Sequence, residues 1–451
     1  MTHGDISGAA ATAPRITGGT AGEIADAVRG LVERGELRAG DALPPVRTLA
    51  AQLGVNRNTA VAAYRQLAQA GLVVSQGRGG TRIAGAPPVA QEGFASAVPG
   101  PGAPELRDVG AANPDPALLP SLEPALARLA PRPVLYGDGV IDPGLEAWAR
   151  EWLAPDVPDP MRLTITNGAF DAVERLLAQA LTRDDAVALE DPCYLATIRT
   201  ARLAGYRPIP VPVDDEGMTV DGLRAALADG ARAVVCTPRA QNPTGASLSE
   251  ARAAALREVL TEHPYVVVIE DDHYSLLSRH PYRSMIGPDH RRWALVRSVS
   301  KFLGPDMSLA IVASDPHTAD RLALRLSPGT TWVSHLLQRL AHVLLSERAT
   351  REAIEGAGAH YAARNAALAA RLRAHGMAVT PGDGLSLWVP VGAPARDAAE
   401  RLRARGWLVR SGDEFALGAA APSRHLRVTA HHLDDAAQER LAAGIAAASR
   451  G

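Results

Sequence analysis

The chain has 451 residues, of which 47% are hydrophobic and 21% charged, and its formal net charge is −2. These values indicate two or three globular domains, and they exclude a disordered chain and a uniformly basic surface for nucleic acid. Two cysteines, Cys193 and Cys236, are too few for a disulfide framework and indicate a reducing compartment. The sequence shows no signal peptide and no apolar stretch that could span a bilayer. We therefore expect a cytoplasmic protein with no membrane partner.

Residues 16–84 are expected to form one small domain of three helices and a hairpin, because apolar residues recur at helical spacing between glycines. Pro45 suits the first turn of the second helix, and Asn56 can cap the third. The expected apolar face of the third helix consists of Val61, Tyr64, Leu67 and Ala68. Two short strands, 72–76 and 81–84, follow on either side of a glycine-rich tip.

The run LPPVRTLAAQLGVNRNTAVAAYRQLAQAGLVVSQGRGGTRI closely resembles the DNA-reading domain of GntR-family regulators, which is a winged helix-turn-helix. The resemblance implies that Arg47 contacts phosphates of double-stranded operator DNA, and that the wing around Gly77 and Gly79 approaches the minor groove. It also implies that the start of the third helix enters the major groove, through Arg57, Asn58 and Thr59. A helix N-terminus and short polar side chains can hydrogen-bond phosphates and base edges. The alternative is a helix-turn-helix that serves protein contacts.

Residues 85–104 are rich in proline, glycine and alanine without any period, which is typical of a linker. From 105 to 451, short apolar runs alternate with helical stretches, as in an α/β domain with buried parallel strands. We expect a large part over about 155–325 and a smaller α+β part over about 330–451. The expected strands are 186–189, 233–236, 266–269, 294–296 and 310–313 in the large part, and 385–391 and 425–429 in the smaller part.

Polar clusters follow the expected strands of the large part at their carboxyl ends, where open α/β sheets bind ligands. The clusters are EDPCY, TPRAQNPTG, EDDHY and RSVSK, in that order along the chain. This set resembles fold-type I pyridoxal-phosphate enzymes of the class I aminotransferase family. The pair of NPTG with a downstream S-x-S-K is fairly specific to that family, whereas a lone Ser-Lys would carry no information.

The resemblance implies a site for pyridoxal 5'-phosphate centred on Lys301, whose amine would form a Schiff base with the cofactor aldehyde. Asp271 would keep the pyridine nitrogen protonated, so that the ring can withdraw electrons. Asn242 and Tyr274 would steady the phenolic oxygen, and His273 is the alternative to the tyrosine.

Further residues match the family at the edges of the cofactor. The phosphate would lie against amides at a helix start and against hydroxyls, supplied by Gly168, Ala169, Phe170, Ser298 and Ser300. Tyr194 would stack on the ring, and Tyr136 would reach the phosphate of the partner subunit. Arg427 would clamp a substrate carboxylate with its planar fork. No metal site is expected.

Two positions depart from the family pattern. The family usually has an arginine shortly after the lysine to grip the phosphate, but this chain has Ser308 there. In addition, Ala169 supplies no side-chain hydroxyl to the phosphate loop. Both differences should weaken phosphate binding. Cys193 stands where relatives often have glycine, and we expect it to be inert, as most intracellular cysteines are.

A GntR-type domain followed by a class I aminotransferase-like domain is the architecture of the MocR subfamily of regulators. The resemblance implies a homodimer, arranged head to tail, whose DNA affinity responds to pyridoxal phosphate or its amine or amino-acid adduct. Vitamin B6 homeostasis and amino-acid or amine catabolism are the pathways it suggests. Three alternatives remain: an aminotransferase with a vestigial DNA-binding head, a regulator that has lost its cofactor, and a repressor whose C-terminal domain is structural.

Overall fold

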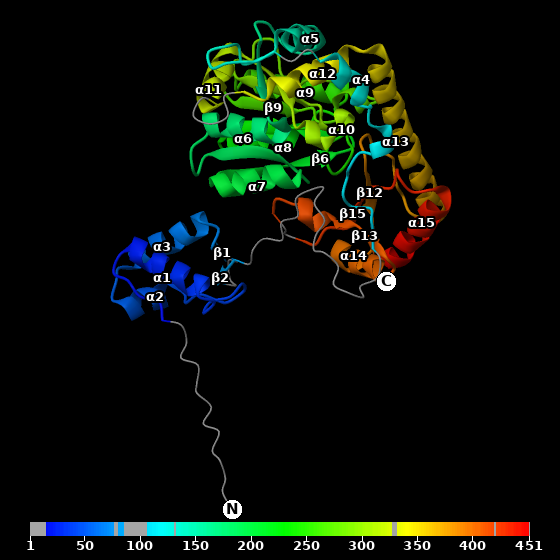
Figure 1. Cartoon of the computed structure of the whole chain (residues 1–451). Coiled ribbons are helices and arrows are strands. Elements are labelled where there is room, and N and C mark those ends of the chain that lie inside the picture. The colour runs from blue at the N-terminus through cyan, green and yellow to red at the C-terminus, as the bar shows by residue number, and fades with distance from the viewer. Residues whose placement is uncertain are drawn as a thin grey trace, which may run out of the picture. The chain divides into compact units, whose positions relative to one another are not determined.

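The computed structural model describes residues 15–75, 80–84, 106–129, 132–326, 332–418 and 421–450. The chain divides into two compact units, residues 1–90 and 91–451, and each has a hydrophobic core of its own (Figure 1). Gly77 and Gly79, which we expect at the tip of the wing, lie outside the described residues.

The N-terminal unit is a winged helix-turn-helix, as predicted. Its elements are α1 (Ala21–Glu33), α2 (Val46–Leu53), α3 (Arg57–Gln69) and the antiparallel strands β1 (Val73–Ser75) and β2 (Thr81–Ile83). Thr20 and Glu23 form a capping box at the start of α1. Gly54 adopts a left-handed φ of 67° and ends α2. The Asn56 side chain accepts a hydrogen bond from the Asn58 amide at 2.8 Å, which confirms Asn56 as the cap of α3.

Two of the four residues that we expected on the buried face of α3 are exposed. Tyr64 and Leu67 are buried, as expected, but Val61 is 40% exposed and Ala68 is also exposed. The helix instead buries Ala60 and Ala63, so its inner stripe follows the spacing 60, 63, 64, 67. The Tyr64 hydroxyl donates to the Pro44 carbonyl at 2.6 Å and thereby ties α3 to the loop before α2.

The C-terminal unit is built on an eight-stranded sheet with the order β4-β11-β10-β9-β8-β5-β6-β7. The strands are β4 (Arg162–Thr166), β5 (Ala186–Asp191), β6 (Arg207–Asp214), β7 (Gly217–Met218), β8 (Ala231–Cys236), β9 (Val267–Asp271), β10 (Trp293–Ser298) and β11 (Ala310–Ser314). Strands β5, β8, β9 and β10 are parallel, as predicted. Strand β6, which we did not predict, is parallel to β5. Our expectation was wrong for β11, which is antiparallel to both of its neighbours. The connection 299–309 contains only the short helix α10 (Ser300–Leu303) and a 3-10 turn, too little chain for a crossover.

Helices cover both faces of this sheet (Figure 1). One core includes α5 (Pro143–Leu153), α8 (Val220–Ala228), α9 (Glu250–Thr261) and α12 (His335–Ser346). The opposite core includes α6 (Gly168–Ala180), α7 (Leu195–Ala204) and α11 (Pro316–Leu326). Successive strand residues alternate between the two cores: Ala188 lies in the first, whereas Val187 and Leu189 lie in the second. Both faces of the sheet are therefore buried, which explains the continuous apolar runs in the sequence.

The smaller part has a separate core around a three-stranded antiparallel sheet. Its elements are β12 (Leu387–Pro390), β14 (Arg410–Ser411), β15 (His425–Val428), α14 (Ala395–Arg403), α15 (Asp435–Arg450) and the end of α13 (Arg348–Ala374). Its boundary differs from our expectation of about 330, because α12 and the first half of α13 pack on the large core. In addition, β3 (Arg107–Asp108) pairs with β13 (Trp407–Leu408), so the first strand of the unit belongs to the smaller part.

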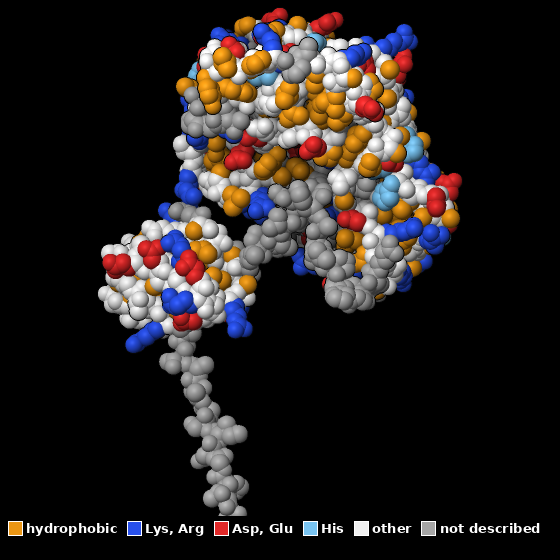
Figure 2. Space-filling model, in the orientation of Figure 1, with side chains coloured by type: hydrophobic (Ala, Val, Ile, Leu, Met, Phe, Trp, Pro, Cys, Tyr) orange, Lys and Arg blue, Asp and Glu red, His pale blue; other side chains and the backbone are white. Residues whose placement is uncertain are grey.

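The described surface mixes charges of both signs. Figure 2 shows acidic and basic side chains interspersed over the drawn face of each unit. This distribution matches the net charge of −2 and leaves DNA binding to a local surface. Across the described ranges, we find no helix that combines the length and the apolar character needed to cross a membrane.

Candidate functional site

A cavity of about 360 Å³ opens at the carboxyl ends of β4, β5, β8, β9 and β10. Ten of the residues that we predicted for cofactor binding line it: Gly168, Ala169, Phe170, Tyr194, Asn242, Asp271, His273, Ser298, Ser300 and Lys301. Tyr274 lines a smaller adjoining pocket, together with Lys301 and Asn242. Tyr136 lines neither pocket; it is 95% exposed and its ring lies 5.5 Å from that of Trp332. The sheet therefore gathers most of the predicted site from segments far apart in sequence.

Lys301 lies at the start of α10, directly after β10. It is the only lysine in the sequence, so the chain has a single ε-amine. Its Nζ donates a hydrogen bond to the carbonyl oxygen of Ala112 at 3.0 Å. The same side chain lines both the cavity and the smaller pocket, which places its amine where the two meet.

Asp271 ends β9 at the floor of the cavity, and its Oδ1 has no hydrogen-bond partner among the described residues. Burial is the main cause that raises the pKa of this carboxyl to about 7; the nearby charges of Asp272 and Glu190 contribute to the rise, and Lys301 opposes it. A buried acceptor without a donor is costly, and a cationic N–H donor would satisfy it. The protonated nitrogen of a pyridine ring is such a donor, so Asp271 fits the role that we predicted.

Asp272, the next residue, is held in the opposite electrostatic state. Its carboxylate accepts hydrogen bonds from Arg239 at 2.7 and 2.8 Å and from Arg297 at 2.7 Å. Although burial alone would raise the pKa of Asp272, the bonds and charges of the two arginines keep it below its ordinary value. Asp272 therefore stays ionised while its neighbour Asp271 retains a proton more readily.

The end of the cavity that we predicted for the phosphate is built from a helix start and hydroxyls. Helix α6 begins at Gly168, and the Thr166 hydroxyl donates to the Gly168 carbonyl at 3.1 Å. Ser298 and Ser300 are joined by a hydrogen bond of 3.1 Å between their hydroxyls. Ser308 also lines the cavity, in a left-handed conformation with φ of 25°. Among the described residues that line this cavity, Lys301 is the one lysine, and none is an arginine.

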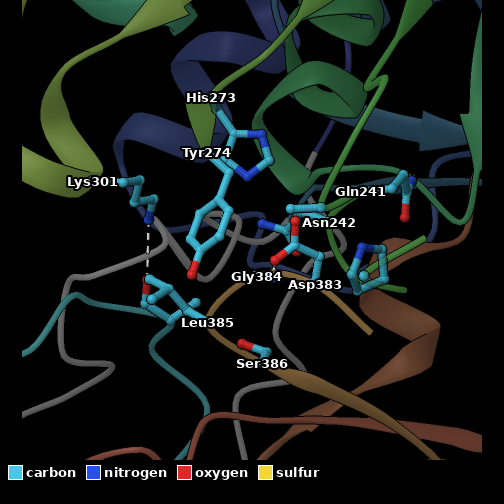
Figure 3. A pocket seen from close by; sticks show the side chains of 13 residues that line it. Gln241, Asn242, His273, Tyr274, Lys301, Asp383, Gly384, Leu385 and Ser386 are labelled. Atoms are coloured by element: carbon cyan, nitrogen blue, oxygen red, sulfur yellow. Dashed lines mark hydrogen bonds between the residues drawn. The ribbon is translucent and has the colours of Figure 1, made fainter. Parts of the chain in front are cut away.

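The smaller pocket of about 30 Å³ presents Tyr274 and His273 beside Asn242. Figure 3 shows the Tyr274 ring reaching between Lys301 and Asn242, with its hydroxyl toward Leu385. Burial raises the pKa of Tyr274 well above its ordinary value, so the hydroxyl stays protonated and can donate. His273 lines both pockets. Both residues therefore remain candidates for the donor to a phenolic oxygen.

Arg427 connects the smaller part of the unit to the site. It lies on β15 and is fully buried, with its guanidinium carbon 4.8 Å from the ring centre of Phe415. Its Nη1 donates to Asn242 Oδ1 at 3.0 Å, and its Nη2 donates to the Gly110 carbonyl at 2.5 Å. The predicted carboxylate clamp thus contacts a residue that lines the cavity.

Our sequence reasoning missed several residues of the site. Thr237 lines the cavity directly after β8, and the strand-end rule that identified its neighbours could have identified it too. Thr197 lines the cavity from the first turn of α7, where no sequence signal points to it. The carbonyls of Gly110 and Ala112 contact the two site cations, and backbone oxygens have no sequence signature.

In the N-terminal unit, the residues predicted to contact DNA lie at the surface of the helix-turn-helix. Arg57 and Asn58 begin α3 and are exposed, and Thr59 is partly exposed. Arg47 is exposed in the first turn of α2. The first turn of α3 therefore presents polar side chains and the amide end of the helix on one surface, which suits phosphates and base edges.

The two units define the class of the protein: a winged helix-turn-helix joined to an aminotransferase-like domain. Residues 20–83 match the family described as bacterial regulatory proteins, gntR family. Residues 113–445 match the family described as aminotransferase class I and II. Among solved structures, the α-aminoadipate aminotransferase LysN of Thermus thermophilus superposes with a TM-score of 0.68 at 24% identity. That match covers 77% of this chain and 93% of LysN, and it shows the fold.

Full-length relatives define the family more closely. The chain is 49% identical to the vitamin B6 salvage pathway transcriptional repressor PtsJ of Salmonella typhimurium, over 95% of this chain and 98% of that protein. It is 26% identical to the probable rhizopine catabolism regulatory protein MocR of Rhizobium meliloti, over 72% and 71% of the two chains. The chain therefore belongs to the MocR subfamily of GntR-type transcription regulators.

We predict that Asp271→Asn reduces the pH dependence of stability of the ligand-free protein. The folded-state pKa of Asp271, about 7, exceeds its ordinary value of 3.8, so the protonated carboxyl stabilises the fold and this contribution is lost as pH rises through 7. Glu190 and Glu270, whose pKa values burial also raises to about 7, act in the same direction. The parent should therefore lose stability between about pH 5 and about pH 8, and the variant should lose less.

Denaturant unfolding at the two pH values measures this difference. The control is Asp221→Asn, because the Asp221 side chain is 96% exposed. An equal loss of stability in Asp271→Asn and the control would show that Asp271 does not titrate in this range.

Proposed function

We propose that the chain is a cytoplasmic, homodimeric transcription regulator that binds operator DNA through its N-terminal unit and pyridoxal phosphate through its C-terminal unit, and that it controls genes of vitamin B6 metabolism. The observation that carries the cofactor assignment is the pairing of Lys301 with Asp271 in one cavity, where the aspartate has a buried acceptor without a donor. The function of PtsJ, the relative with 49% identity, supports the pathway and favours repression.

When bound, pyridoxal phosphate supplies an aldehyde and an electron-withdrawing ring. In this proposal, Lys301 attaches the aldehyde carbon and Asp271 accepts the hydrogen bond of the ring nitrogen. Asn242 and either Tyr274 or His273 hold the phenolic oxygen, and Tyr194 covers the ring. The start of α6, at Gly168, Ala169 and Phe170, would hold the phosphate together with the hydroxyls of Ser298, Ser300 and Ser308.

Subunit pairing is supported by the exposed apolar side chains around Tyr136. Leu135 and Val140 are 68% and 44% exposed, and Tyr136 is 95% exposed. Large apolar groups gathered at a surface favour a protein contact. We therefore propose that Tyr136 reaches the cofactor phosphate of the partner, in a head-to-tail dimer. Ligand binding would change DNA affinity by a coupling free energy of about 1–3 kcal/mol.

The test of the cofactor site is covalent attachment to Lys301. Protein titrated with pyridoxal phosphate should develop an absorption band in the near visible, and borohydride should then fix one cofactor per chain. Because the sequence has one lysine, Lys301→Ala should abolish both the band and the ε-amine adduct. Mass spectrometry of peptides locates the adduct and separates it from any reaction at the α-amine.

The outcome also discriminates between the alternatives. A parent protein without a band at saturating cofactor would be a cofactor-free regulator. Sustained transamination of an amino acid and a keto acid by the loaded protein would favour an enzyme with a vestigial DNA-binding unit.

The test of the DNA-binding unit is Arg57→Ala, measured on DNA from upstream of the chain's own gene. Loss of one arginine contact to a base or phosphate costs about 1–3 kcal/mol, so affinity should fall by roughly five- to one-hundredfold. The control is Arg65→Ala, which removes an exposed arginine two turns further along α3. Both variants should keep the cofactor band. Parent-like DNA binding by Arg57→Ala would contradict the placement of α3 in the major groove.

Ser308→Arg should strengthen cofactor binding by about ten- to one-hundredfold, since a hydrogen bond to a charged group contributes about 1.5–3 kcal/mol. Arginine can grip a phosphate with two parallel bonds, which a hydroxyl cannot do. Spectroscopic titration measures the affinity for pyridoxal phosphate. The variant Ser308→Ala measures how much the native hydroxyl contributes to that affinity. Pyridoxal, which lacks the phosphate, should show no such gain. Unchanged affinity in Ser308→Arg would mean that another group already holds the phosphate.

A further inference from the structure

The two cations of the cofactor site are both held by one short backbone segment. We call this segment, Val109–Ala112, the strap. The Ala112 carbonyl accepts a hydrogen bond from Lys301 Nζ at 3.0 Å. Two residues earlier, the Gly110 carbonyl accepts one from Arg427 Nη2 at 2.5 Å. Strap carbonyls therefore contact the predicted attachment point of the cofactor and the predicted clamp for a carboxylate.

The smaller part of the unit fixes the direction of these carbonyls. The Val109 amide donates to the Leu408 carbonyl at 2.9 Å, and the Thr429 amide donates to the Val109 carbonyl at 2.6 Å. The Gly110 amide donates to the Asp108 side chain at 2.8 Å. A Cβ atom on Gly110 would lie 3.1 Å from the Arg410 amide nitrogen, so the packing leaves the strap little room.

The last residue of the strap is in an unfavourable conformation. Ala112 has a φ of 49°, in the left-handed region, and is buried. This conformation costs a residue with a Cβ about 1–2 kcal/mol, so it persists only where surrounding contacts hold it. The hydrogen bond from Lys301 is one such contact.

A ligand would compete with the strap for both cations. When Lys301 Nζ bonds to an aldehyde carbon, the aldehyde oxygen leaves as water and the nitrogen keeps at most one proton. It then no longer offers the three donors of an ammonium group. A carboxylate that binds Arg427 with two parallel hydrogen bonds competes with Gly110 for the donors of the same guanidinium group. Ligand binding at either residue therefore weakens the hydrogen bonds that hold the strap.

We infer that the strap is a positioning element that holds Lys301 and Arg427 until ligand groups take them, and that it is released in two steps. The aldehyde of the cofactor releases Ala112, and the carboxylate of an amino acid then releases Gly110. In sequence, the strap follows the stretch 85–104, which leads from the DNA-binding unit. Release of the strap would therefore loosen the first part of the C-terminal unit that follows this stretch. This inference rests on the proposed function for the identity of the ligand.

Hydrogen exchange of the full-length protein tests the two steps. The amides of Val109, Gly110 and Thr429 report the strap, since each takes part in the bonds that fix it. Pyridoxal phosphate alone should speed exchange of these amides, and addition of L-alanine, which brings a carboxylate, should speed it further. The amide of Glu216, which donates to Asp214 at 2.9 Å, serves as an internal reference.

A pair of variants tests the positioning role. Asp108→Ala removes the exposed acceptor that orients Gly110. The control, Asp214→Ala, removes an exposed acceptor of a backbone amide at the β6–β7 turn, together with its ion pair to Arg252. Only Asp108→Ala should raise the affinity of the cofactor-loaded protein for L-alanine, by about three- to tenfold, because less of the Gly110 contact must be displaced. The same variant should also show a smaller change of DNA affinity on ligand binding than the parent.

The absorption band separates the two possible failures. A normal absorption band with unchanged hydrogen exchange at the three reporter amides overturns the proposed release of the strap and leaves the cofactor assignment intact. No band at saturating pyridoxal phosphate overturns both. Equal affinities for L-alanine in Asp108→Ala and Asp214→Ala overturn the positioning role of Gly110.

Discussion

The ion pairs of Asp272 with Arg239 and Arg297 are the interaction on which the ligand site depends. Strand β9 ends at Asp271 and Asp272 follows directly, so two adjacent carboxylates lie inside the unit, and two such charges cannot both remain unpaired there. The arginines satisfy Asp272, and Arg297 is itself held by Asp156 at 2.6 Å and packed 4.8 Å from the rings of Trp152 and Tyr282. Removing one partner of a buried ion pair typically costs about 3–5 kcal/mol. This arrangement leaves Asp271 as the carboxyl that can respond to a ligand.

The two parts of the C-terminal unit contribute different chemistry to the same cavity. The large sheet supplies the amine, the aspartate and the helix start, all at the carboxyl ends of its strands. The smaller part supplies Arg427 and the bonds that hold Val109, and both reach the site across the boundary between the two cores. A movement of the smaller part would therefore change the surroundings of Arg427 and Lys301, which is the coupling that the proposed function requires.

The elements that the sequence predicted best are those with local signals. Asn56 as a cap and the apolar runs of β5, β8, β9 and β10 were recognisable from nearby residues. The strand-end clusters located most of the cavity because parallel strands bring their carboxyl ends together. The sequence could not show that β11 is antiparallel, since direction depends on the length and path of a connection. Nor could it show that β3 joins the smaller part or that Ala112 contacts Lys301, because these contacts are made by backbone atoms of distant segments.

The single lysine has a consequence for the DNA-binding surface. An aldehyde condenses with accessible primary amines wherever they occur, and such a reaction removes the positive charge that a phosphate contact needs. The residues that we expect to contact DNA phosphates and bases include Arg47 and Arg57, and a guanidinium group stays protonated throughout the physiological range. Under the function proposed above, reactive cofactor would therefore leave the charges of these arginines unchanged. The one ε-amine of the chain lies in the cavity of the C-terminal unit, so condensation at this amine is separate from the contacts to the operator.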